Sequence, residues 1–375
     1  MGFDDFCGNS SAVAWLRRLL ASGRLPHALI LAGPVGVGRY SLAQMLAKAL
    51  HCLDREKERE TDFCGQCKNC RTIALADDRH AALEWAEQER EKLTRRPREL
   101  PLIIRHHPDV VVLPPNGPLR LFQIEQARSL KQSLAFVSTS DRRQVFIIPD
   151  AERMDAPAAN SLLKSLEEPP PNVLLLLTTS GEAALLPTIR SRCMTIWLNP
   201  VQPAEVMDFL RKSGAGKTEQ ERQRRAVFSR GCPGLALRMD VEHYLKVRDA
   251  LLDILLAGAE RRNFGPLFAS IQKLVAEKEG LENLLDVLYS LLHDILHIEA
   301  KANGEPLRNV DRPKRLWQVA RTLGIGGVQR AAAQISELER NLRRNVSKQL
   351  ALEAFAISLA SARGPQLGSQ GRGYL

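Results

Sequence analysis

An apolar segment, residues 27–33, runs directly into a glycine-rich loop of sequence GPVGVGRY, and the loop runs directly into a helical pattern. In the following segment, SLAQMLAKALHC, apolar residues recur at helical spacing. A strand, a glycine-rich loop and a helix in this order can form an anion site, because the loop amides and the amino end of the helix point to the same place. This order of elements predicts an α/β fold that contains a loop with the shape of a phosphate-binding loop.

Four more apolar segments are each typical of a buried strand: residues 109–113, 144–149, 172–179 and 193–198. Helical patterns separate them, so we expect a parallel sheet covered by helices on both faces. From Pro200 onward only helical patterns remain, at 200–240 and 241–362, before a polar, glycine-rich tail at 363–375 that we expect to be disordered. One long last helix is predicted from apolar residues that step by three or four: Ile335, Leu338, Leu342, Val346 and Leu350.

The glycine-rich loop departs from the pattern of a working ATPase. Gly33, Gly36 and Gly38 preserve its backbone spacing, but Arg39 and Tyr40 stand where Lys and Ser or Thr belong. The wide guanidinium of Arg39 does not replace a compact ammonium at a crowded site, and the Tyr40 oxygen lies too far out to bind Mg²⁺. We therefore expect a degenerate loop without ATP hydrolysis, while nucleotide binding without hydrolysis stays open.

A group of cysteines follows the helix after the loop. The segment HCLDREKERETDFCGQCKNC contains Cys52, Cys64, Cys67 and Cys70. Four thiolates can close a tetrahedral structural Zn²⁺ site, and clustered cysteines in a reducing compartment favour that use. An iron–sulfur cluster would require a further cysteine shortly beyond the last three, where Ala74 stands. Zinc is therefore the expected metal.

The composition is that of a globular protein. Hydrophobic residues make up 44% and charged residues 26%, and no apolar run is long enough to span a membrane. We expect a cytoplasmic protein with no membrane partner. The net charge of +10 favours partners that carry phosphates.

Basic residues gather in two places. We interpret both as solvated charged faces, with contact to duplex DNA as the alternative for the second. The first cluster, at 90–105, contains Arg90, Lys92, Arg95, Arg96, Arg98 and Arg105, and the second spans 211–230.

Several further motifs occur together between residues 24 and 200. They are HHPDVVVL, DAERMDAPAANSLLKSLEEPP, the strand-end pair Thr178–Thr179, and Ser-Arg-Cys at 191–193. In these motifs the chain resembles the clamp-loader branch of the AAA+ ATPases and, within it, the delta-prime family of bacterial DNA polymerase III. That family also inserts a four-cysteine zinc module after the phosphate-loop helix. The resemblance implies an AAA+ domain at 1–199 with a zinc module at 52–70, an all-α lid at 200–240 and an all-α collar for oligomerisation at 241–362.

The resemblance also implies roles for particular residues. In clamp loaders the arginine of the Ser-Arg-Cys motif reaches the γ-phosphate of ATP on a neighbouring subunit, so Arg192 is expected to act as an arginine finger in trans. The family pattern puts Pro149 where the metal-binding Asp belongs, with Asp150 at the following acid. Together with Arg39 and Tyr40, this departure implies a stationary subunit that does not hydrolyse ATP and completes a neighbour's site.

The implied partners are the gamma/tau and delta subunits, contacted through the collar and the AAA+ faces, and, through the complex, the sliding clamp and primed DNA. ATP would be bound by neighbouring subunits, and the process is DNA replication by the DNA polymerase III holoenzyme. Two alternatives stay open. ATPase activity of the isolated chain would favour an ATP-hydrolysing motor subunit, and tight, salt-sensitive DNA binding by the monomer would favour a stand-alone zinc-dependent nucleic-acid-binding protein.

Overall fold

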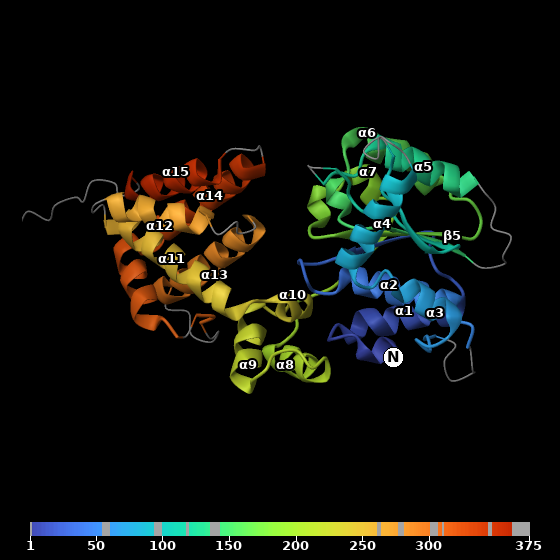
Figure 1. The fold of residues 1–375 in the computed structure, drawn as a ribbon, viewed down its shortest axis with the longest axis horizontal. Helices are drawn as coiled ribbons and strands as arrows, with labels where there is room; N and C mark the ends of the chain where they lie inside the picture. Colours follow the sequence, from blue (N-terminus) through green and yellow to red (C-terminus); the bar gives the residue numbers. More distant parts are fainter. Residues whose placement is uncertain are drawn as a thin grey trace, which may run out of the picture. The chain divides into compact units, whose positions relative to one another are not determined.

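The chain divides into two compact units, residues 1–238 and 239–375 (Figure 1). The computed structural model describes residues 2–54, 61–93, 100–117, 120–135, 143–260, 264–276, 281–300, 307–309, 311–343 and 347–361. Within these residues no helix is both long and apolar enough to cross a membrane.

The first unit is built on a sheet of six strands in the order β2-β3-β4-β5-β1-β6. The strands are β1 (Ala28–Ala32), β2 (Ile104–His107), β3 (Val110–Val112), β4 (Gln144–Ile148), β5 (Val173–Thr179) and β6 (Met194–Trp197). β1 pairs in parallel with β5 and β6, and β4 pairs in parallel with β3 and β5. The predicted parallel sheet is confirmed for these five strands, which correspond to the five apolar segments of the sequence.

The strand β2 was not predicted, and it runs antiparallel to β3 at the edge of the sheet. Its sequence is IRHH, in which Ile104 and His107 are buried and Arg105 is exposed. An edge strand does not have to be buried on both faces, so it carries no continuous apolar run. The apolar pattern that reveals the five parallel strands is therefore missing here.

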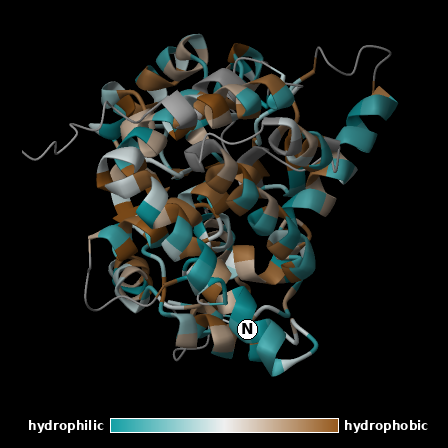
Figure 2. Cartoon of the chain, turned by 90° about the vertical axis from the view of Figure 1, so that its left-hand side faces the viewer, coloured by the Kyte–Doolittle hydropathy of each residue, from teal (hydrophilic) through white to brown (hydrophobic). Residues whose placement is uncertain are grey.

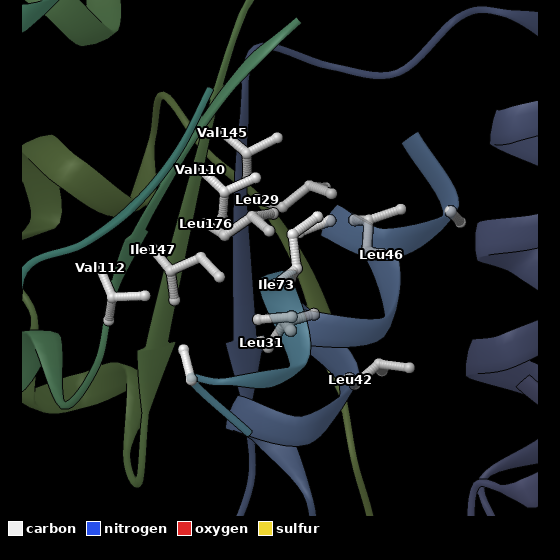
Figure 3. Close-up of a cluster of buried hydrophobic side chains, with 14 of the residues drawn as sticks. Leu29, Leu31, Leu42, Leu46, Ile73, Val110, Val112, Val145, Ile147 and Leu176 are labelled. Atoms are coloured by element: carbon white, nitrogen blue, oxygen red, sulfur yellow. The ribbon is translucent and has the colours of Figure 1, made fainter. Parts of the chain in front are cut away.

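Helices cover both faces of the sheet, and each face has its own core. Leu29 of β1 belongs to one core and Ile30 to the other, because successive side chains of a strand point to opposite faces. Figure 3 shows the first core, where strand residues meet Leu46 of α2 and Ile73 of α3. This face is covered by α1 (Ser10–Ser22), α2 (Arg39–His51), α3 (Lys68–Ala74) and α4 (Arg79–Leu93). The other is covered by α5 (Ile124–Ala135), α6 (Ala156–Glu167) and α7 (Pro187–Arg190).

Three shorter helices complete the first unit: α8 (Pro203–Lys212), α9 (Glu219–Phe228) and α10 (Pro233–Arg238). They share a small core that includes Val206 and Leu210 of α8 and Ala236 of α10. The structure groups these helices with the sheet in one unit. A separate lid domain at 200–240, with a boundary after residue 199, stays a prediction.

The second unit contains helices and no strand among its described residues. Its helices are α11 (Val241–Glu260), α12 (Phe264–Ala276), α13 (Leu281–Glu299), α14 (Pro313–Arg343) and α15 (Lys348–Ser361). Figure 2 shows hydrophobic residues gathered on the inner sides of helices and hydrophilic residues on their outer sides. The buried guanidinium of Arg248 donates to both carboxylate oxygens of Asp311, at 2.6 and 2.9 Å, and so fastens the loop before α14 to α11.

The prediction of one long last helix is wrong in its second half. α14 ends at Arg343 and α15 begins at Lys348. Ile335 is fully buried in the core, whereas Leu350 on α15 is exposed. Side chains of α15 point around its axis in directions that do not follow from those of α14, so the apolar stripe of α14 does not continue along α15. Val346 and the tail at 363–375 lie outside the described residues.

Candidate functional site

The glycine-rich loop joins β1 to α2 and is packed closely by protein. Gly33, Gly36 and Gly38 have φ angles of 150°, 82° and 110°, which favour glycine. A Cβ added to Gly33 would lie 2.3 Å from the carbonyl oxygen of Leu198, and one added to Gly36 would lie 2.6 Å from Leu235 of α10. The close approach of protein atoms therefore requires glycine at these positions whether or not a phosphate binds.

Arg39, at the position of the loop Lys, is buried, with 7% of its side chain exposed. Its Nη2 lies 3.9 Å from Oδ1 of Asp150. Burial lowers the pKa of Arg39, and the negative charges of Glu152 and Asp150 oppose that shift. The guanidinium therefore faces acids of its own chain.

The hydroxyl of Tyr40 is used in contacts within the chain. It donates a hydrogen bond to the carbonyl oxygen of Ala76 at 2.7 Å and accepts one from Nε2 of Gln44 at 2.8 Å. Burial raises the pKa of Tyr40 above its usual value, so the group is a neutral phenol at physiological pH. Tyr40 thus fastens α2 to the segment that follows α3.

Beyond β4 a cation from a distant segment meets Asp150. Pro149 offers no carboxylate, and Asp150 follows it in a left-handed conformation with φ 50°. Arg79, the first residue of α4, places Nη2 2.6 Å from Oδ2 of Asp150. Sequence reasoning missed Arg79. It lies in the charged segment DDRH, and nothing in that segment points to a partner 71 residues away.

The two threonines at the end of β5 are hydrogen-bonded to nearby backbone. Oγ1 of Thr178 accepts the N–H of Asp150 at 3.1 Å. Oγ1 of Thr179 donates to the carbonyl oxygen of Gly181 at 3.0 Å. Thr179 therefore caps the strand end, and Thr178 helps to hold the backbone of Asp150 in its left-handed conformation.

Arg192 lies away from the loop, shortly after α7, and its own chain holds its guanidinium. Nη2 is 2.5 Å from Oε1 of Glu167 at the end of α6. Nη1 donates to the carbonyl oxygen of Thr188 at 2.9 Å and to Oγ of Ser191 at 3.0 Å. The side chains of Arg192 and Glu167 are 32% and 47% exposed. Water therefore reaches this ion pair, and such pairs contribute only about 0–1 kcal/mol to stability.

The four cysteines come together as predicted from their spacing. The sulfur atoms of Cys52, Cys64, Cys67 and Cys70 all lie within 4.8 Å of one another. Backbone N–H groups donate to three of these sulfurs: Cys64 to Cys52 at 3.4 Å, Cys67 to Cys64 at 3.2 Å and Cys70 to Cys67 at 3.5 Å. Burial raises the pKa of Cys52 and of Cys70. Burial also acts upward at Cys67, but hydrogen bonds from the N–H groups of Leu53 and Cys70 and with the neighbouring cysteine thiols together lower its pKa to about 6. Four clustered sulfurs with N–H donors that favour thiolates fit a structural Zn²⁺.

A second group of metal-ligand residues fits a metal less well. His51, His107 and Asp109 also place ligand atoms within 4.8 Å of one another. However, the N–H of Asp109 donates to Nδ1 of His107 at 3.1 Å. The proton of a neutral His107 must then sit on Nε2, and a protonated nitrogen cannot bind a metal. The ligand set is therefore incomplete in this arrangement.

Several arginines of the second basic cluster form ion pairs with acidic residues on the same helices. Arg211 pairs with Asp208 at 2.7 Å, and Nη2 of Arg225 lies 2.7 Å from Oε1 of Glu221. Such pairs are typical of a solvated charged helix face. Contact of this cluster with DNA stays an open alternative. From the first cluster, three residues lie outside the described part of the chain: Arg95, Arg96 and Arg98.

Two protein-family models match the chain. The model described as DNA polymerase III, delta subunit, matches residues 8–202, which is more than half of the chain. The model described as DNA polymerase III, delta subunit, C terminal, matches residues 242–360.

Curated relatives point the same way. DNA polymerase III subunit delta' of Bacillus subtilis is 25% identical over 338 residues, covering 90% of this chain and 91% of the relative. The delta' subunit of Pseudomonas aeruginosa is 26% identical over 341 residues, covering 90% and 93%. The tau subunit of Escherichia coli is 28% identical over 204 residues, covering 54% of this chain and 26% of the relative. The chain therefore belongs to the DNA polymerase III delta subunit family, a clamp-loader family of DNA replication.

Proposed function

We propose that this chain is a stationary clamp-loader subunit, which does not hydrolyse ATP and completes the ATP site of a neighbouring subunit. ATP hydrolysis requires a Lys on the β- and γ-phosphates, and Mg²⁺ held by a hydroxyl and a carboxylate. The observation that carries the proposal is that all three positions have another use or no ligand. Arg39 faces Asp150, Tyr40 donates to Ala76, and Pro149 has no side-chain oxygen.

Arg192 is the residue that we assign to the neighbour's site. Its ion pair with Glu167 is reached by water, so exchanging the carboxylate for a phosphate costs little. A planar guanidinium can hold two phosphate oxygens at once, and it stabilises the charge that spreads over the γ-phosphate in the transition state. Arginine fingers of this kind contribute about 10³–10⁵ in rate.

The remaining parts of the chain have supporting roles in this proposal. The four cysteines hold a structural Zn²⁺ that crosslinks the segment after α2. The collar at 241–362 and the AAA+ faces contact gamma/tau and delta subunits, and the assembled complex meets the sliding clamp and primed DNA in the cytoplasm. The delta' and tau names of the relatives support a multi-subunit setting.

Reconstituted clamp-loader complexes test the proposal. Complexes with Arg192→Ala should assemble normally but lose a large part of the ATP hydrolysis that clamp and primed DNA stimulate. The loss should be partial, because sites elsewhere in the complex keep their own arginines. Arg192→Lys should restore little, since one ammonium does not reproduce the guanidinium fork. Arg190→Ala, two residues away, is the matched control and should leave hydrolysis unchanged.

Other results would contradict the proposal in different ways. Normal hydrolysis and normal clamp loading with Arg192→Ala would show that Arg192 is a surface charge. Failure of the complex to assemble would make it an interface residue. Steady ATP hydrolysis by the isolated chain, abolished by Arg39→Ala, would favour a motor subunit instead.

A further inference from the structure

Asp150 has cation partners from its own chain. In a working ATPase the acids at this edge of the sheet face Mg²⁺. Here Nη2 of Arg79 lies 2.6 Å from Oδ2 of Asp150, and Nη2 of Arg39 lies 3.9 Å from Oδ1. A guanidinium therefore lies beside each oxygen of the carboxylate. We call these three residues the closed cluster.

The charges around the closed cluster balance without a ligand. Glu152 accepts hydrogen bonds from the N–H and the hydroxyl of Ser180, at 3.1 and 2.5 Å. The charges of Glu152 and Asp150 both act on Arg39. Two guanidinium groups thus face two carboxylates. The formal charges of these four side chains therefore sum to zero, although Nη1 of Arg39 has no hydrogen-bond partner among the described residues.

The segment before Arg79 is fastened to α2 by several contacts. Tyr40 donates to the carbonyl oxygen of Ala76 at 2.7 Å, and Lys48 forms an ion pair with Asp77. The guanidinium of Arg79 lies over the ring of Tyr40, 5.9 Å from its centroid. These contacts fix where α4 begins and direct its first side chain toward Asp150.

The cysteine cluster lies immediately before this segment. The sulfur of Cys67 accepts the N–H of Cys70 and so caps the amino end of α3. α3 ends at Ala74, and its Ile73 packs into the core beside α2. A metal on the four sulfurs would hold α3 at its amino end, and α3 in turn sets the position of the short connection that leads to Arg79.

We propose that Arg79 takes the place of a nucleotide-bound metal ion at the degenerate loop, and that the cysteine module serves to place it there. Its guanidinium neutralises Asp150 and, through the Tyr40 ring, links the end of β4 to α2. Because of this link, the glycine-rich loop before α2 is ordered although no nucleotide is bound. The inference rests on the proposed function, because a subunit that does not hydrolyse ATP needs a nucleotide-independent way to hold this shape.

Amide hydrogen exchange on the full-length, zinc-loaded protein without nucleotide tests the inference. Arg79→Ala should speed exchange about three- to tenfold in the first hydrogen-bonded turn of α2, residues 42–45, and in the turn after β4, residues 153–154. Asp150→Asn should speed exchange at least as much, because it removes the charge that faces both Arg79 and Arg39, and the double variant should exchange no faster than Asp150→Asn. Zinc content should stay unchanged in all three variants.

Two further variants separate the effect of losing a positive charge from the effect of losing the cysteine module. Arg71→Ala removes an exposed positive charge from α3 and should leave exchange at 42–45 unchanged. Cys67→Ser should speed exchange at 42–45 as Arg79→Ala does, since the module then no longer positions Arg79.

Unchanged exchange at 42–45 in both Arg79→Ala and Asp150→Asn would overturn the inference. So would an equal effect of Arg71→Ala, or protection of the wild-type loop by added Mg²⁺-ATP, which would mean that nucleotide occupies the site. Unchanged exchange at 42–45 in Cys67→Ser would show that the cysteine module does not position Arg79. None of these measurements depends on ATP hydrolysis by the complex, so the inference and the proposed function can fail separately.

Discussion

Arg39, at the position of the loop Lys, and Arg192, which we propose as an arginine finger, have opposite surroundings. Arg39 is 7% exposed and belongs to the closed cluster with Asp150 and Arg79. Arg192 is 32% exposed and is held by Glu167, whose side chain is 47% exposed. We call Arg192 and Glu167 the open pair.

The difference in burial decides which arginine can change partners. Removing one partner of a buried charge pair is strongly destabilising, because the remaining charge has lost both water and its partner. An exposed pair loses about 0–1 kcal/mol when it separates, because water replaces the lost contact. Arg39 is therefore suited to a fixed internal role. The side chain of Arg79 in the closed cluster is 32% exposed, as that of Arg192 is, but its partner Asp150 is only 22% exposed, against 47% for Glu167. The open pair is therefore the one suited to exchange its carboxylate for a ligand on another molecule.

The largest expected effect is that of removing the metal, which should loosen the closed cluster and leave the open pair as it is. Wild-type protein should contain about one Zn²⁺ per chain, and Cys67→Ser should lose most of it and lower the melting temperature by about 5 °C. The closed cluster should loosen, because Arg79 follows the cysteine module. The open pair should not, because it lies beside α6 and α7. Elemental analysis and calorimetry measure the first two effects, and amide exchange compares the two regions.

Cys232→Ser is the matched control for the metal, since Cys232 lies outside the four clustered cysteines. It should keep the zinc content of the wild type. Two results would break the contrast: wild-type protein, prepared without chelator, that contains no zinc, or Cys67→Ser protein in which exchange at 188–192 rises as much as exchange at 42–45.

The same contrast shows what the sequence can predict about the fold. Five strands were predicted because their segments are rich in apolar residues, as a parallel strand buried on both faces must be. β1, β3, β4 and β5 are buried in this way, whereas β6, at the other edge of the sheet, was found although its Met194 and Trp197 are exposed. The edge strand β2 was not predicted, since Arg105 and two histidines interrupt its pattern. The break between α14 and α15 was also missed, because apolar residues happen to keep helical spacing across it.

Candidate sites follow the same logic. The cysteine cluster was predicted because its ligands lie close together in the sequence. Arg192 was singled out through a motif, but its partner Glu167 was not. Arg79 was missed altogether, since its contact with Asp150 depends on where α3 and α4 lie. Contacts between distant segments leave no periodic pattern in one sequence, so these two partners required the structure.

A smaller effect concerns Glu167 in the open pair. If Glu167 competes with phosphate for Arg192, Glu167→Gln should raise the stimulated ATP hydrolysis of the reconstituted complex about twofold, in line with the small energy of an exposed pair. Glu168→Gln, at the next position, is the matched control and should leave the rate unchanged. A rate that falls with Glu167→Gln would mean that the carboxylate positions the arginine and does not compete for it.

The last prediction is that a change in the closed cluster has no effect on ATP hydrolysis. The double change Arg39→Lys with Tyr40→Thr restores the two side chains that the loop lacks, yet phosphate release by the isolated protein should stay at background. Pro149 still offers no carboxylate to Mg²⁺ in this variant. Measurable turnover by this variant would show that Arg39 and Tyr40 alone prevent hydrolysis, and that the missing carboxylate at Pro149 does not.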